Sequence, residues 1–184
     1  MGFPHPTIDV PGHHPGLAAE LRGLHADPDG LGAALVAACR GAEATPGHVC
    51  ATAWVFSTDR SEMLLVRHRR LGWATPGGHV HIGESTRAGA LRELHEETAL
   101  TAGDVRPLLP DPGPAIVHVT DVAAPGEPAH RHWNVGWCFT ADSSLGLSAG
   151  HGARWFAVDD LPDDAPDDLR PVTAVLLTLN PSEG

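Results

Sequence analysis

The chain contains no lysine, glutamine or tyrosine, and all 12 of its basic residues are arginines. Against them stand 23 acidic residues, which gives a formal net charge of -11 at pH 7. Because such a chain repels phosphate backbones and anionic headgroups, we expect neither a nucleic-acid polymer nor a membrane as its partner. A small phosphate-bearing substrate would also be repelled unless metal ions or local arginines compensated the charge.

Cysteine is scarce, and long apolar runs are absent. Cys39, Cys50 and Cys138 are an odd number and lack CxxC spacing, which favours reduced cysteines over a disulfide framework. No run reaches the roughly 18 apolar residues that span a bilayer. The N-terminal sequence MGFPHPTIDVPGHHPG lacks the basic start and apolar centre of a secretory signal. These features predict a cytoplasmic protein.

Histidine is abundant, with 13 residues. The pairs His13/His14 and His130/His132 have no cysteine partners at the spacing of a zinc motif. We therefore do not expect a structural zinc site.

The 184 residues, 42% of them hydrophobic, suit one globular domain with an appendage. Residues 1–15, rich in proline, are predicted to be a flexible arm. Leucines at helical spacing predict two short helices in an extension over residues 16–44, and residues 45–184 form the main domain. There, alternating or apolar runs predict strands at 49–57, 63–68, 115–122, 131–140 and 154–158, a loop at 75–78, and helices at 86–98 and 168–179. This order predicts an α/β (α+β) fold in which a mixed sheet lies between helices.

The segment Gly78 to Leu100, GHVHIGESTRAGALRELHEETAL, carries the chemical signal. Its helix begins after Ser85, a suitable N-cap, and buries one apolar face. Three carboxylates at spacing i, i+3 and i+4 share another face, those of Glu93, Glu96 and Glu97. Their mutual repulsion disappears if divalent cations bind there, and a preceding loop can fold Glu84 onto the same cluster. A solvated acidic face is the alternative.

This segment resembles the box of the Nudix hydrolases: Gly, five residues, Glu, seven residues, then Arg-Glu-aliphatic-any-Glu-Glu-any-Gly-aliphatic. The matching positions are Gly78, Glu84, Arg92, Glu93, Leu94, Glu96, Glu97 and Leu100. Ala99 stands where the family usually has glycine. Since alanine favours helices and Gly103 offers a later stop, we expect the helix to continue to Leu100 or Thr101.

The resemblance implies a Nudix fold and hydrolysis of a nucleoside diphosphate linked to another group. It implies Mg2+, or Mn2+, held by Glu93, Glu96 and Glu97, with Glu84 as an indirect ligand through water or as a residue that orients that water. Glu93 and Glu97 are expected to be direct ligands and Glu96 a ligand or general base. Arg92 and Gly78 are expected to support the glutamates. The resemblance also allows a homodimer, since family members often dimerise.

Residues outside the box give weaker indications of substrate binding. Arg67, Arg69 and Arg70 are the densest positive charge and suggest phosphate contacts, with surface ion pairs as the alternative. His132 and Asn134 lie on the polar face of one predicted strand, which contacts either a base or sugar, or solvent. The sequence leaves the exact substrate open.

The rival function is a catalytically silent Nudix-fold module that binds a ligand or regulates, although the intact glutamate set argues against it. An isopentenyl-diphosphate isomerase relative is a third reading, disfavoured because no cysteine stands in a matching context.

Overall fold

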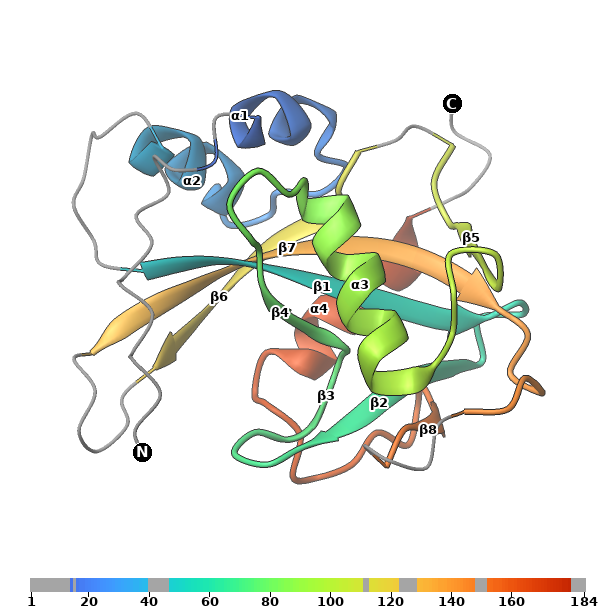
Figure 1. Ribbon diagram of the computed structural model, residues 1–184. Coiled ribbons are helices and arrows are strands. Elements are labelled where there is room, and N and C mark those ends of the chain that lie inside the picture. The colour runs from blue at the N-terminus through green and yellow to red at the C-terminus, as the bar shows by residue number, and fades with distance from the viewer. Residues whose placement is uncertain are drawn as a thin grey trace, which may run out of the picture.

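A computed structural model of the chain describes residue 14 and residues 16–39, 47–110, 113–122, 129–147 and 152–179. A mixed eight-stranded sheet lies at its centre, with α3 (Thr86–Thr98) on one face and α4 (Leu169–Thr178) on the other (Figure 1). The predicted class, a mixed sheet between helices, is confirmed. The predicted arm, apart from His14, lies outside the described residues. Within the described part of the chain, no helix has the length and apolar character needed to cross a membrane.

Two long parallel strands form the middle of the sheet. β1 (Gly47–Ser57) pairs with β7 (His130–Ala141) along its whole length, from Gly47 opposite Arg131 to Ser57 opposite Ala141. On its other edge, β1 pairs first with β4 (Gly77–His79) and, near its end, with β2 (Glu62–His68). The remaining strands lie further out: β3 (Gly72–Ala74), β5 (Val105–Pro107), β6 (Ile116–Val122) and β8 (Arg154–Ala157).

Successive side chains of β1 point to opposite faces of the sheet and so belong to two separate layers of the core. Val49, Ala51 and Val55 belong to the same apolar cluster as Ala90 and Leu94 of α3. The other face of β1 carries Trp54 and Phe56, which pack in a second cluster with apolar residues of α4. The first half of that second face is polar, with His48, Cys50 and Thr52. Because strand side chains alternate, these three point to the α4 side of the sheet.

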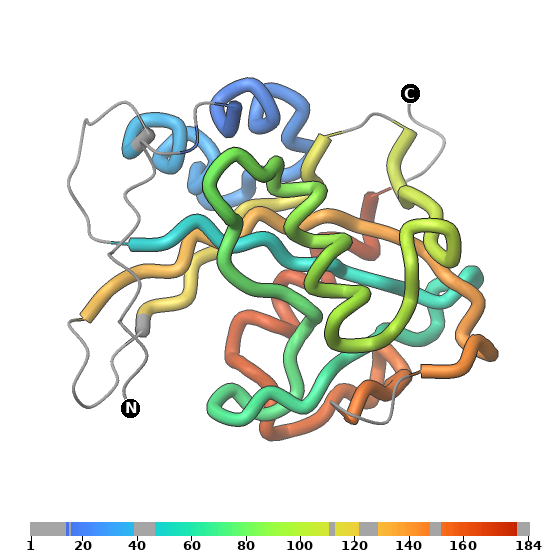
Figure 2. Tube along the Cα trace, in the orientation of Figure 1, coloured from blue at the N-terminus to red at the C-terminus, as the bar shows by residue number. Residues whose placement is uncertain are grey.

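The segment 16–39 packs against the main domain near the N-terminal end of α3 (Figure 2). It contains α1 (Leu17–Glu20), a 3-10 turn η2 (Leu21–Gly23) and α2 (Leu31–Cys39). Leu17, Leu21 and Leu35 are buried in the same cluster as α3. The division between an extension at 16–44 and a domain at 45–184 stays a prediction, although this shared core ties the two parts together.

Backbone and side-chain hydrogen bonds reinforce this contact. The amide of Ala26 donates to the carbonyl of Ala115 at 2.9 Å, just before β6. The Glu20 carboxylate accepts from the amide of Thr86 at 3.1 Å and from its hydroxyl. Thr86 is the first residue of α3, so a carboxylate from the extension caps the helix that carries the glutamates.

The strand prediction missed three short elements. The predicted loop at 75–78 was wrong in its second half, because Gly77 and Gly78 begin β4, opposite Thr52 and Ala51 of β1. A Cβ on Gly77 would stand 2.7 Å from the carbonyl oxygen of Ala51. Glycine therefore lets this strand approach β1 closely. The strands β3 and β5 were also missed; at three residues each, they are too short to show a periodicity.

The predicted end of α3 was also wrong. The helix stops at Thr98, and Ala99 adopts the left-handed conformation with φ 68°. The Ala99 amide still donates to the His95 carbonyl at 2.9 Å, and the Leu100 amide donates to the Thr98 hydroxyl at 3.1 Å. The turn directs Leu100 into the core, where it is buried. Burying a leucine is worth about 1.5–3 kcal/mol, which offsets the roughly 1–2 kcal/mol that a left-handed alanine costs.

This geometry predicts that Ala99→Gly stabilises the protein by about 1 kcal/mol, because glycine removes the strain of the left-handed turn. The matched control is Ala88→Gly, the same change at an exposed position inside α3, which should destabilise by about 0.5–1 kcal/mol. Urea denaturation of both variants measures the difference. Destabilisation by Ala99→Gly would contradict the observed helix end.

Candidate active site

The rotation of α3 about its axis decides where its carboxylates point. The Ser85 hydroxyl caps the helix by accepting from the Ala88 amide at 3.1 Å, as predicted. Leu94 and Thr98 are completely buried and fix one face against the sheet. The glutamates are therefore held away from this face, with Glu93 only 16% exposed at its side chain and Glu96 55% exposed.

Arg92 joins the carboxylates into one network. Its guanidinium donates to both oxygens of Glu84, at 3.0 and 3.1 Å, and to Oε1 of Glu93 at 2.7 Å. It also lies 3.6 Å from an oxygen of Glu96 and donates to the His79 carbonyl at 3.0 Å. One cation thus faces several carboxylates, and a net negative charge remains at the site.

Arg92 also shifts the titration of Glu84. Hydrogen bonds from Arg92 hold the pKa of the Glu84 carboxyl below its ordinary value, with a further contribution from the His81 amide. A lowered pKa means that this ionised carboxylate stabilises the fold above its unfolded pKa. That contribution is lost as the pH falls through the folded pKa.

The glycines of β4 lie directly against the glutamates. The Gly77 amide donates to Oε2 of Glu97 at 3.1 Å. A Cβ placed on Gly78 would stand 2.4 Å from Oε1 of Glu93 and 2.7 Å from its carboxyl carbon. Glycine at this box position therefore leaves the space that the Glu93 carboxylate occupies.

Because the sequence predicts Glu93 to be a metal ligand, we expect Gly78→Ala to move its carboxylate and to weaken divalent-metal binding at least tenfold, since the placement of a ligand sets metal affinity. Gly83→Ala is unsuitable as a control because its φ is 81°. Gly146→Ala meets open space and provides the comparison. Calorimetric titration with Mn2+ measures both. Equal affinities in the two variants would show that Glu93 does not depend on this space.

A cavity of about 1130 Å³ opens beside the glutamate helix. Glu97 lines it, together with the polar face of β1 and residues of β4, β6 and β7. Among the predicted substrate-binding residues, Arg69, Arg70, His132 and Asn134 line this cavity. The amide nitrogen of Asn134, which is nearly buried, donates to the Thr120 hydroxyl at 3.1 Å.

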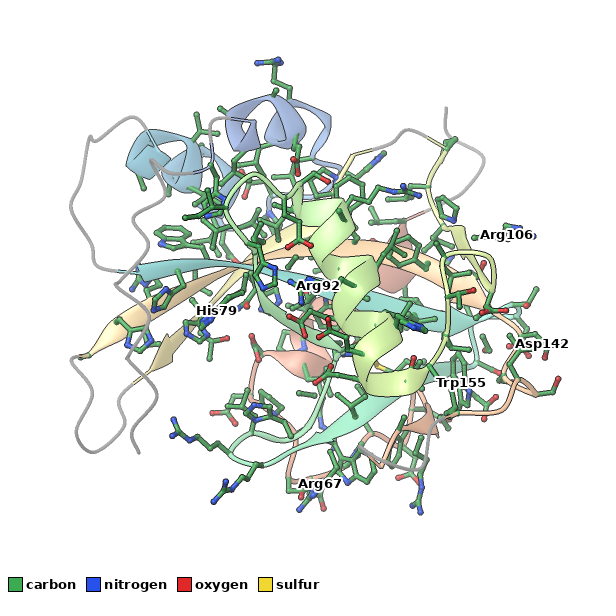
Figure 3. All side chains as sticks on the ribbon, in the orientation of Figure 1. Arg67, His79, Arg92, Arg106, Asp142 and Trp155 are labelled. Carbon is green, nitrogen blue, oxygen red and sulfur yellow. The ribbon has the colours of Figure 1, made fainter. Side chains whose placement is uncertain are left out.

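Arg67 is placed elsewhere. Its guanidinium forms an ion pair with Asp164 and stacks over Trp73, 5.6 Å from the ring centre. It is exposed and lies outside the cavity lining, and Figure 3 shows it far from Arg92 and His79. The surface ion pair that the sequence left as the alternative is thus what forms at this position. Alternation along β2 explains the outcome, since Val66 faces the cavity and Arg67 does not.

Two groups of cavity residues were missed by the sequence. His118 of β6 pairs with Asp168 at 2.8 Å, and both line the cavity. His48, Cys50 and His79 gather with His130 and His132 near the starts of β1 and β7 and at the end of β4. Only the strand pairing brings these residues together, because they are far apart in the sequence. Burial and the charge of Glu93 raise the pKa of the Cys50 thiol well above its ordinary value.

Comparisons with known proteins agree with this fold and box. A family model described as the NUDIX domain matches residues 46–176, and the chain belongs to that family. A Bacillus subtilis (strain 168) protein named an uncharacterized Nudix hydrolase, YvcI, is 30% identical over 111 residues. The match covers 58% of this chain and 65% of the relative, so the chain spans just under two thirds of that protein's length.

Solved structures support the fold. A NUDIX-family hydrolase from Clostridium perfringens has a TM-score of 0.56 at 20% identity, covering 70% of this chain and 95% of that one. An Ap4A hydrolase from C. elegans has a TM-score of 0.53 at 20% identity, covering 71% of this chain and 93% of that one. The predicted Nudix fold and family membership are therefore confirmed.

Proposed function

We propose that the chain is a hydrolase that cleaves the diphosphate linkage of a small molecule, a nucleoside diphosphate linked to another group. The observation that carries this proposal is the glutamate network of α3, which reaches a large cavity through Glu97. The family match supports a hydrolase, since the matched relatives described above bear that name. The cavity, at about 1130 Å³, has room for a ligand of nucleotide size.

The donor set suits Mg2+ or Mn2+. Glu93, Glu96, Glu97 and Glu84 offer only carboxylate oxygens, which are the ligands these ions prefer. The carboxylates of Glu84, Glu93 and Glu96 surround the single guanidinium of Arg92, and Glu97 accepts from the Gly77 amide, which leaves an excess of negative charge that a divalent ion would neutralise. We propose Glu93 and Glu97 as direct ligands, with Glu96 as a ligand or the general base and Glu84 as an indirect ligand. When bound, such ions neutralise phosphate charge and acidify water.

The remaining residues of the cavity serve binding. Arg69 and Arg70 supply positive charge for phosphate oxygens in a chain that otherwise repels them. His132 and Asn134 present polar atoms to a base or sugar. Arg92 holds Glu84 and Glu93 in place and does not itself meet the substrate. A homodimer and a cytoplasmic location stay predictions.

A panel of substrates tests the proposal. Nucleoside and non-nucleoside diphosphates are incubated with the protein and Mg2+ or Mn2+, and released monophosphate and phosphate are measured. We expect metal-dependent release from at least one nucleotide, and none in the presence of a chelator. Tight binding of a nucleotide without turnover under any metal would support the rival, a catalytically silent Nudix-fold binding module.

A further inference from the structure

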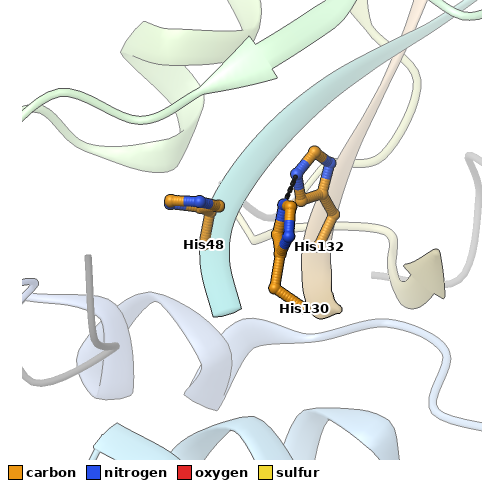
Figure 4. Close-up of side chains that lie close together, drawn as sticks. All are labelled: His48, His130 and His132. Carbon is orange, nitrogen blue, oxygen red and sulfur yellow. Dashed lines mark hydrogen bonds between the residues drawn. The ribbon is translucent and has the colours of Figure 1, made fainter. Parts of the chain in front are cut away.

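A cluster of imidazoles lies near the N-terminal ends of the parallel strands β1 and β7. His48, His130 and His132 come together from β1 and β7, as Figure 4 shows. His79 of β4 lies beside them, with its ring centre 4.5 Å from that of His48 and 5.1 Å from that of His132. His48, His79, His130 and His132 all line the cavity.

The backbone imposes this arrangement. His48 and His132 are direct partners in the parallel β1–β7 ladder, so their side chains stand on the same face of adjacent strands. His130 lies two residues before His132 and therefore shares that face. Strands that are paired over eleven positions hold the three rings before any ligand arrives.

The donor atoms are already close to coordination distance. Nε2 of His130 lies 3.2 Å from Nε2 of His132. Two imidazole nitrogens at about 2.0–2.1 Å from one tetrahedral Zn2+ stand roughly 3.3 Å apart. Donor atoms of His48, His130 and His132 all lie within 4.8 Å of one another. Binding of one ion by all three would require the His48 ring to move toward the other two.

We propose that His48, His130 and His132 form a second metal site, which binds a zinc-class transition-metal ion and is distinct from the glutamate site. Imidazole suits zinc and its neighbours, whereas Mg2+ prefers oxygen. Three protein ligands leave a fourth position for water or a donor from a molecule in the cavity. The excess negative charge of the chain further favours a cation.

A second set of donors, Cys50, His79 and His132, also lies within 4.8 Å. The two sets share His132, so His132 can bind an ion in only one of them at a time. We assign the ion to the three imidazoles, because neutral imidazole binds without losing a proton while a thiol must lose one. The two assignments give different spectra with cobalt.

The test uses the full chain without a histidine tag, stripped of metal with a chelator. Zn2+ is titrated in competition with a chromophoric chelator, with millimolar Mg2+ present. We expect one Zn2+ per chain, and affinity at least 100-fold weaker in His130→Ala and His132→Asn. Two controls should change the Zn2+ affinity less than twofold: His95→Ala, which removes an exposed histidine of α3, and Glu97→Gln. Unchanged affinity in the first two variants, or loss in Glu97→Gln alone, would overturn the proposal.

Cobalt substitution decides the ligand set. Co2+ bound by three imidazoles should give visible ligand-field absorption without a thiolate charge-transfer band. Such a band, abolished by Cys50→Ser, would show that the cysteine set holds the ion and that the assignment is wrong. Circular dichroism of the metal-free variants checks their fold. If a histidine variant does not fold, the cobalt spectrum of the wild type still tests the proposal. A wild-type protein without ligand-field absorption would show that the three imidazoles do not bind the ion.

Discussion

Glu97→Gln is expected to reduce turnover by roughly 10²–10³-fold, equivalent to about 3–4 kcal/mol of transition-state stabilisation. The substitution keeps the volume of the side chain and removes the charge of a proposed metal ligand. In the wild type the Gly77 amide donates to Oε2 of Glu97 at 3.1 Å, and in the variant the amide oxygen of glutamine can accept the same hydrogen bond. Because repulsion among the carboxylates falls, the melting temperature without metal should hold or rise. Steady-state kinetics on the best substrate of the panel, with thermal denaturation, measures both effects.

A matched control is Glu62→Gln on β2, which removes the same charge from a residue outside the cavity lining. It should leave turnover within about twofold of the wild type, since surface substitutions usually have small effects. Wild-type turnover in Glu97→Gln would contradict the role of the glutamate helix. A large loss in the Glu62 variant would show that charge removal acts generally.

Deletion of residues 1–39 is expected to prevent stable folding. Leu17, Leu21 and Leu35 are buried in the same core as α3, and each leucine is worth about 1.5–3 kcal/mol. The sum, about 5–9 kcal/mol, approaches the total stability of an ordinary domain, about 5–15 kcal/mol. Deletion of residues 1–13 should cost less than about 1 kcal/mol, because that segment has few apolar side chains. Thermal and urea denaturation compare the two truncations.

A point variant separates packing from capping in this region. Glu20→Ala removes the carboxylate that bonds the first residue of α3 and should cost about 0.5–2 kcal/mol, as for other helix caps. Asp29→Ala, at an exposed position of the same segment, is the comparison and should have little effect. If the deletion of 1–39 leaves stability unchanged, the extension is an independent appendage.

The sequence predicted the long elements and the box because both depend on local patterns. Ser85 capped α3 as expected, and the buried positions Leu94 and Thr98 followed from helical periodicity. Strands β1 and β7 were placed within two residues of their bounds. These features are specified by side chains close together in the chain.

What the sequence missed depends on tertiary contacts. Ala99 ends α3 because Leu100 must enter the core, and no propensity scale contains that requirement. β4 exists because β1 is beside it, and the Glu20 cap exists because the extension folds back onto α3. The histidine cluster requires the register of three strands, so a search for ligands along the chain could not find it.

Electron paramagnetic resonance tests metal binding by the glutamates most directly, because bound Mn2+ loses the sharp spectrum of the free ion. We expect binding by the wild type, strong loss in the double variant Glu93→Gln/Glu97→Gln, and no change in His130→Ala. Equal Mn2+ binding by all three proteins, or loss in the histidine variant alone, would contradict the claim that the glutamates of α3 hold the divalent ions.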